Sequence, residues 1–162
     1  MPSSLRIPEE QLVAMIGRVT VSWGDIHYAV FRLFVVLTGM PNALAESIFF
    51  TLRSDATQRE ITATAAKHVL SEELFKRVSA VFSQIGSAAR ERNVAIHAMW
   101  ATHYPSGHIT PNPWVTGPRL LRKGEFDKQF AELEERLKDL FREVLRLQPD
   151  VEAYVTSVRN AK

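Results

Sequence analysis

The sequence predicts an all-α protein, an up-and-down bundle of four to six helices with an irregular segment or short hairpin before the last long helix. Three observations predict it. Apolar residues recur every three or four positions over most of the chain, which is the spacing of one helix face. Half of the prolines fall in one segment, residues 103–124. With 162 residues, 46% of them hydrophobic, the chain can bury a core, so we expect a single domain over residues 1–162.

The first helix should begin near Pro8 and end before Gly39 and Pro41. Glu9 and Glu10 stand in its first turn, where acidic side chains interact favourably with the helix dipole. Glycine followed by proline is a typical end of a helix. The apolar stripe of this helix comprises Leu12, Ile16, Val19, Trp23, Ile26, Val30 and Phe34.

Three further helices are expected before the irregular segment. A short one covers residues 41–53, and a third is capped by Ser54 or Asp55. Ser71 followed by two glutamates opens a fourth, which should continue to about Thr102. The stripe of this fourth helix comprises Leu74, Val78, Phe82, Ile85, Ala89, Ile96 and Met99.

Residues 103–124 form the irregular segment, because four prolines and three glycines prevent a helix from persisting there. Ile109 and the pair at 114–115 could form a short hairpin. The segment also contributes three cations and no acid, which makes a local cationic patch: Arg119, Arg122 and Lys123.

The last long helix should start after Gly124. Its stripe has the three-four spacing of a coiled-coil seam: Phe126, Phe130, Leu133, Leu137, Leu140, Val144 and Leu147. Pro149 should interrupt it, with Asp150 capping a last short helix. The mixed charges of this helix indicate a solvated face with ion pairs four residues apart.

The composition of the chain argues against several kinds of ligand. The net charge of +2 is too weak by itself to argue for nucleic-acid binding, and the absence of cysteine excludes disulfides and thiolate metal sites. The five histidines lack the spacing of a metal site, so we expect no metal and no cofactor.

The most apolar run, residues 29–38, is too short for a membrane span and contains Arg32. The N-terminus has no apolar targeting segment, and we expect a cytoplasmic protein without membrane contact.

The fourth helix carries one polar cluster that its apolar pattern does not explain, formed by Arg92, Asn93 and His97. After Ala89 the next core-facing position is Arg92, so a guanidinium stands where an aliphatic side chain is expected. Burying an unpaired charge is costly, so Arg92 needs a carboxylate, a phosphate or a wet cleft. The candidate carboxylates are Asp25, Glu46 and Glu91.

The spacing of this cluster makes one helix a poor active site. Asn93 and His97 lie on one face, one turn apart. Arg92 and His97 instead diverge by roughly 140° and are separated by about 7.5 Å along the axis. A second copy of the helix across a two-fold axis would place two arginines and two histidines around one cleft. A dimer through this helix is therefore expected.

The stretch from Arg92 to His97, with the polar Asn93 after the arginine, resembles the Arg-x4–6-His motif of HEPN domains. Residues 98–100 are similar to the small residue and aromatic that often follow that histidine. The helix order is also similar, with a long first helix, the motif late in a long central helix, an irregular excursion and a closing helix. The resemblance covers most of the chain in architecture, but only residues 92–100 in motif.

This resemblance implies a helical bundle that dimerises through the motif helix. Many HEPN domains are metal-independent ribonucleases, often toxins or antiviral effectors, and others are inactive scaffolds or regulators. If the roles known in the family are transferred to the matching positions of this chain, Arg92 and His97 would be the catalytic pair, and Asn93 would be an accessory polar residue. Some relatives have an acidic residue after an aromatic-glycine step in the first helix. In this chain, either Asp25, which follows Gly24, has that role, or no residue has it.

The chemistry of these residue types suits RNA cleavage. Imidazole titrates near neutrality and can move protons, while a guanidinium can clamp phosphate oxygens. Four cations could guide an RNA backbone or be ordinary surface charge: Arg90, Arg119, Arg122 and Lys123. The alternative is a non-catalytic interaction module with a protein partner such as an antitoxin, in which Arg92 pairs with a carboxylate and His97 is an interface residue. A plain helical bundle with an accidental motif is a third possibility.

Overall fold

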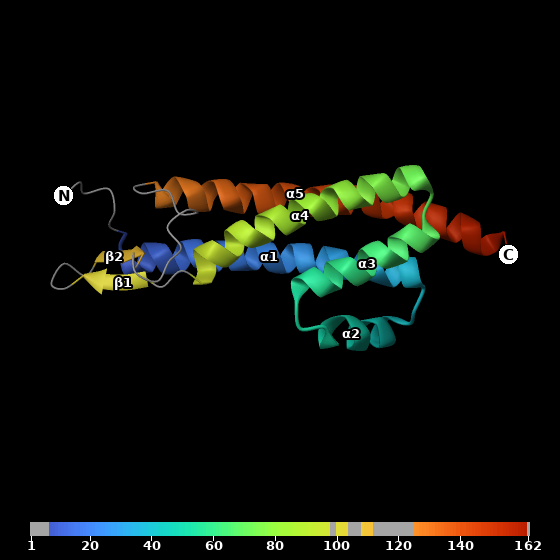
Figure 1. Cartoon of the computed structure of the whole chain (residues 1–162), viewed down its shortest axis with the longest axis horizontal. Helices are drawn as coiled ribbons and strands as arrows, with labels where there is room; N and C mark the ends of the chain where they lie inside the picture. Colours follow the sequence, from blue (N-terminus) through green and yellow to red (C-terminus); the bar gives the residue numbers. More distant parts are fainter. Residues whose placement is uncertain (1–6, 98–99, 104–107, 112–124, 162) are drawn as a thin grey trace. The chain divides into compact units, whose positions relative to one another are not determined.

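The computed structural model describes residues 7–97, 100–103, 108–111 and 125–161. This part of the chain is an all-α helical bundle with one short hairpin, which confirms the predicted fold class (Figure 1). In chain order the elements are α1 Glu9–Thr38, α2 Asn42–Thr51, α3 Asp55–Val69, α4 Glu72–His97, β1 Trp100–His103, β2 His108–Pro111 and α5 Phe126–Asn160. None of the described helices is both long and apolar enough to cross a membrane.

The chain divides into two compact units, which are described separately. Unit 1 combines Met1–Trp23 with Ser87–Lys138, and unit 2 combines Gly24–Gly86 with Asp139–Lys162. Helices α1, α4 and α5 each contribute residues to both units. The hairpin belongs to unit 1, and α2 and α3 belong to unit 2. The single domain predicted over residues 1–162 stays a prediction.

The predicted helix ends are largely confirmed. The hydroxyl of Ser54 accepts a hydrogen bond from the Thr57 backbone N–H at 3.1 Å, so Ser54 is the cap of α3. The hydroxyl of Ser71 accepts from the Leu74 N–H at 3.3 Å at the start of α4. Gly39 has φ +66°, the left-handed conformation that glycine adopts easily after a helix.

The prediction that the fourth helix reaches Thr102 is wrong. Helix α4 ends at His97, and Thr102 lies in β1, opposite Ile109 of β2 in an antiparallel register. The other side of Ile109 pairs with Ile7, through N–H to O distances of 2.9 and 3.2 Å. Ile109 thus forms a hairpin with β1, whereas the residues at 114–115 lie outside the described part. Backbone pairing of β1 with β2, which is itself paired with Ile7, outweighs the local helical pattern here.

Pro149 does not interrupt the last helix, so the predicted short helix beginning at Asp150 is also wrong. Helix α5 continues through Pro149 to Asn160. A proline removes the hydrogen bond to the carbonyl four residues earlier, which belongs to Leu145. That residue is 43% exposed, so its carbonyl can be solvated instead.

The core of unit 1 is formed by apolar residues of α1, α4, α5 and the hairpin. The Trp100 ring packs edge-on against Phe126, with ring centroids 5.8 Å apart, and lies 6.3 Å from Phe130. Most predicted stripe positions in this unit are buried, and Ile16 and Ile96 are half-buried. The buried residues are Ile7, Leu12, Met15, Val19, Trp23, Ala88, Ala89, Ala95, Ile109, Phe126, Phe130, Leu133 and Leu137.

The core of unit 2 centres on Phe49 of α2. Its ring lies 5.4 Å from Phe31 and 5.5 Å from Phe34 of α1. The remaining predicted stripe positions in this unit are also buried: Ile26, Val30, Leu74, Val78, Phe82, Ile85, Leu140, Val144 and Leu147.

Candidate functional site

The side chain of Arg92 lies against the aromatic face of Trp23. The guanidinium carbon is 4.9 Å from the centroid of the indole, within unit 1. The same guanidinium donates through Nη1 to Oδ1 of Asn93 at 2.6 Å. A cation over an indole face gains about 0.5–2 kcal/mol, depending on how far the pair is withdrawn from water. Arg92 is half-buried, so its head group is held in one place by two neighbours.

The inward direction that the heptad pattern predicts for Arg92 explains this contact. Trp23 is buried at 4% exposure on the same α1 stripe that the sequence assigns to the core. The sequence does not predict this partner. Periodicity shows which face of a helix a residue lies on, but it does not show which residue of another helix packs against that face. Among the candidate carboxylates, Glu91 accepts a hydrogen bond from Arg136 of α5. Asp25 belongs to unit 2.

Asn93 and His97 are exposed, and His97 is the last residue of α4. Their spacing of four residues puts both on one helix face, one turn apart. The described residues therefore present an imidazole and an amide to solvent. The guanidinium of Arg92 stands beside that amide.

The predicted cationic residues divide into two groups. Arg90 is exposed on α4. Arg119, Arg122 and Lys123 lie outside the described residues, so their guiding role for a phosphate backbone stays a prediction.

A charged network joins α1 and α5 in unit 1. The Glu134 carboxylate contacts Lys138 at 2.7 Å and Arg18 at 3.0 Å. Hydrogen bonds, from Lys138 first and also from Arg18, hold the pKa of Glu134 below its ordinary value. The pKa of Lys138 is raised by its hydrogen bonds to Glu134 and to Glu135. The predicted ion pairs of this helix are confirmed here.

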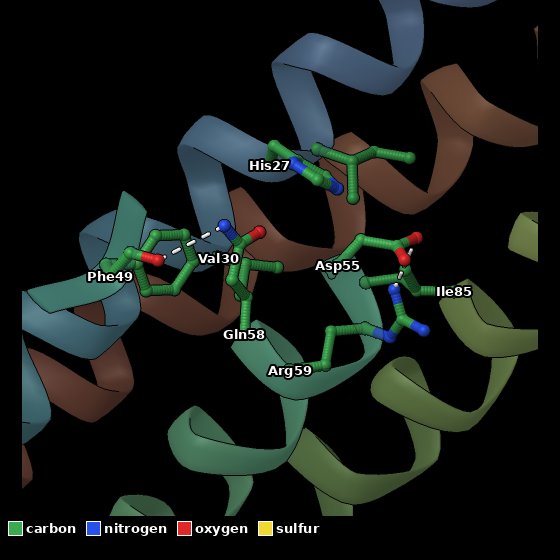
Figure 2. A pocket seen from close by; sticks show the side chains of 8 residues that line it. His27, Val30, Phe49, Asp55, Gln58, Arg59 and Ile85 are labelled. Atoms are coloured by element: carbon green, nitrogen blue, oxygen red, sulfur yellow. Dashed lines mark hydrogen bonds and ion pairs between the residues drawn. The ribbon is translucent and has the colours of Figure 1, made fainter. Parts of the chain in front are cut away.

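A small pocket in unit 2 is lined partly by His27, Gln58 and the ion pair of Asp55 and Arg59 (Figure 2). Gln58 is 7% exposed and donates from Nε2 to the carbonyl of Phe49 at 3.2 Å, and also to that of Leu52. It thereby satisfies carbonyls near the end of α2. The space among these side chains is too small even for a water molecule, so this pocket is structural.

Two further observations bear on ligands. A shallow groove of about 320 Å³ in unit 2 is lined by Val81 and Leu147 and by the charged Arg77, Glu143 and Arg146, and it contains no motif residue. In the described part of the chain, no three histidine, aspartate or glutamate residues gather closely enough to hold a metal ion.

Comparison with known proteins gives no match. No protein-family model matches the chain, and no curated protein or solved structure matches it either. The resemblance to HEPN domains therefore stays a prediction from the motif of Arg92 to His97 and from the helix order.

Proposed function

We propose that this protein is an HEPN-like endoribonuclease that works as a homodimer without a metal ion, with Arg92, Asn93 and His97 as its site residues. The observation that carries the proposal is the anchoring of Arg92. Trp23 and Asn93 hold its guanidinium next to the exposed face that presents His97.

A fixed guanidinium suits phosphate binding for two reasons. Arginine loses considerable rotamer entropy when it orders around a ligand, and Arg92 is already ordered by Trp23. A guanidinium also carries five N–H donors in one plane, a fork that matches the oxygens of a phosphate. Arg92 can therefore stabilise the extra negative charge on a phosphorane, in which phosphorus is bonded to five oxygens.

RNA supplies the nucleophile for the reaction. His97 takes the proton of a ribose 2′-OH, and the oxygen then attacks the adjacent phosphorus. The bond from phosphorus to the 5′-oxygen breaks, and a protonated imidazole gives that oxygen its proton. The products are a 2′,3′-cyclic phosphate and a 5′-OH. No metal takes part in any of these steps.

The dimer supplies what one helix lacks. Arg92 and His97 of one α4 point in directions that differ by roughly 140°. Two copies of α4 around a two-fold axis would bring the arginine of one chain toward the histidine of the other. Two imidazoles at one cleft also provide both the base and the acid. Such a nuclease would act on cytoplasmic RNA as a toxin or defence effector, and an antitoxin would be its protein partner.

The direct test is cleavage of labelled single-stranded RNA in the presence of EDTA. Arg92→Ala and His97→Ala should each lower the rate by about 100-fold or more, since each removes a group that acts in the transition state. His68→Ala removes another exposed histidine, on α3, and should leave the rate unchanged. Analysis of the product ends should find cyclic phosphate. Cleavage that persists in both motif variants would remove the assignment.

A second candidate is a non-catalytic interaction module, and one observation favours it. Both contacts of Arg92 described above are made within the chain, so they also suit a purely structural role. In that case no RNA is cleaved, and Arg92→Ala chiefly lowers the stability of the fold. Thermal unfolding of Arg92→Ala, measured beside the cleavage assay, separates the two candidates.

A further inference from the structure

Two contacts fix how the last turns of α4 are oriented in unit 1. Arg92 lies against Trp23 of α1, and Glu91 forms an ion pair with Arg136 of α5. All four residues belong to unit 1. At 100° per residue, Glu91 and Arg92 point about 100° and 200° around the helix from Arg90. Arg90 therefore points outward, toward neither neighbouring helix, and it is exposed.

Arg90 shares this outward line with His97. The two residues are seven apart in sequence. Because seven residues make almost two full turns, they point within about 20° of each other and lie about 10.5 Å apart along the axis. Asn93 lies between them, about 60° from Arg90 around the helix. All three side chains are exposed, so Arg90 extends the face that presents His97.

Arg90 has no partner among the described residues, which distinguishes it from the other arginines described in unit 1. Each of those contacts a group within the chain: Arg18, Arg92 and Arg136. Arg90 makes no hydrogen bond or ion pair in this part of the structure. The positions three and four residues away on α4 hold glycine, serine, asparagine and valine. No carboxylate of its own helix therefore stands one turn away to neutralise it.

The outward strip from Arg90 to His97 also lacks any compensating acid. Glu91 is the single acidic residue between positions 87 and 97, and it is paired on the α5 side. On α5, exposed charges instead pair one turn apart, as Lys128 does with Glu132. An uncompensated cation attracts anions from solution more strongly than a paired one does. This strip is therefore suited to an anionic ligand.

We infer that Arg90 binds a backbone phosphate one or two nucleotides away from the bond that His97 cleaves. The inference rests on the proposed function, which supplies the RNA strand and the place of the cleaved bond. Arg90 lies about 10.5 Å along the same line of α4, where a strand that continues past His97 would pass. A guanidinium matches the oxygens of a phosphate, and a phosphate contact carries no base information. The substrate is thus an extended single strand, bound here without regard to sequence.

This role differs from that of Arg92 and His97 in its effect on the rate. The phosphate held by Arg90 does not react, so the contact is equally strong before and in the transition state. Such uniform binding lowers KM and leaves kcat unchanged. The contact is available only to a substrate long enough to reach Arg90. The expected effect therefore depends on the length of the RNA.

The test compares two labelled RNAs with the full chain, a dinucleotide with a single phosphate and a strand of about twelve nucleotides, within the site sizes of single-strand binders. Arg90→Gln should raise KM for the long strand about tenfold, since one charge-assisted contact is lost, and leave kcat unchanged. For the dinucleotide, both constants should stay at their wild-type values.

Salt dependence gives a second readout, measured as the fluorescence anisotropy of a labelled strand of the same length. This strand is made of 2′-deoxynucleotides, which lack the nucleophile and are not cleaved. In Arg90→Gln the slope of log Kd against log salt concentration should become shallower by about 0.7, the share of one phosphate on a single strand. Arg90→Lys keeps the charge and should keep most of the slope.

Arg146→Gln is the matched control. Arg146 is exposed on α5 in unit 2, and it too makes no hydrogen bond or ion pair among the described residues. Its loss removes the same charge from the chain, but away from the strip of α4. KM for the long strand and the salt slope should therefore stay near their wild-type values.

Three results would overturn the inference. The first is an Arg90→Gln variant with unchanged KM and salt slope on the long strands. The second is an equal loss with the dinucleotide and the long strand, because Arg90 would then act at the cleaved phosphate or in the fold. The third is an equal loss in Arg146→Gln, because the effect would then belong to the net charge.

Failure of the proposed function gives a different result. If the wild-type chain cleaves no RNA, the nuclease is wrong, and anisotropy of the uncleavable strand still tests Arg90. A salt slope that Arg90→Gln makes shallower would then support the phosphate site without the reaction. A wild-type chain that does not bind the strand would remove the site as well.

Discussion

The guanidinium of Arg92 lies 4.9 Å from the centre of the Trp23 ring, so the most unusual charge of α4 rests on a buried aromatic residue of α1. This contact fixes one residue of the motif before any ligand arrives. It also links the stability of unit 1 to the candidate site. A substitution at Trp23 should therefore change both.

A double-mutant cycle measures this link. Trp23→Phe keeps an apolar ring but has a weaker π-face, and Arg92→Met keeps much of the length without the charge. We expect a coupling free energy of about 0.5–2 kcal/mol between the two sites, the range for a partly desolvated cation–π pair. Urea unfolding of the four proteins gives the value. Purely additive effects would show that the contact adds no stability.

The stability of the protein should fall in acid partly through Glu134. Because its pKa is lowered by Lys138 and Arg18 in the folded chain, the ionised carboxylate favours folding. That contribution is present above the ordinary value of 4.5 and is lost as the pH falls through the lower folded-state pKa. The pair is near the surface, so the contribution should be about 1 kcal/mol or less.

Glu134→Gln should therefore lower the free energy of unfolding at pH 7 and have little effect well below pH 4.5. Urea unfolding at the two pH values measures the difference. Glu60→Gln, at an exposed position in the interior of α3, serves as the matched control. An equal loss at both pH values would mean that ionisation of Glu134 does not contribute.

Replacing Pro149 should stabilise α5. Pro149→Ala restores the N–H that can bond to the carbonyl of Leu145 and removes the clash of the ring with the preceding turn. We expect a gain of about 1–3 kcal/mol in the free energy of unfolding, since proline inside a helix costs about 3 kcal/mol relative to alanine. Circular dichroism during urea unfolding measures it. A destabilised variant would mean that the packing of Leu147 and Val151 depends on a bend at this proline.

Two helix-interior glycines should respond alike to alanine. Gly86 of α4 and Gly17 of α1 both have open space where a Cβ would stand. Each replacement should raise the free energy of unfolding by up to about 1 kcal/mol, because glycine weakens a helix relative to alanine. Urea unfolding of the two variants measures the gain. A variant less stable than the wild-type chain would mean that the added methyl group meets a neighbour.

Much of the fold could be predicted from the sequence because it depends on neighbours along the chain. The three-four spacing of apolar residues identified the buried faces of α1, α4 and α5. Hydroxyl caps identified the starts of α3 and α4, since Ser54 and Ser71 bond to N–H groups three residues later. The exposed position of His97 relative to Asn93 follows from the same periodicity.

The end of α4 could not be predicted in this way. The local pattern continues the helix to Thr102, but the chain enters β1 instead. The deciding contact is the pairing of β1 with β2, where Thr102 stands opposite Ile109. Ile109 in turn exchanges two backbone hydrogen bonds with Ile7, which is distant in sequence. Likewise, Pro149 remains helical because buried residues on both sides hold α5 in place.

The candidate site, like the fold, could be predicted from the sequence only in part. The sequence by itself determined that Arg92 points inward from α4 and that Asn93 and His97 share a face, because a helix repeats every 3.6 residues. Only the tertiary structure decided that Arg92 meets the ring of Trp23, because that contact depends on how α1 and α4 pack in unit 1. Periodicity determines the direction in which a side chain points from its own helix axis. The residue that it contacts depends on where along that axis a second helix packs.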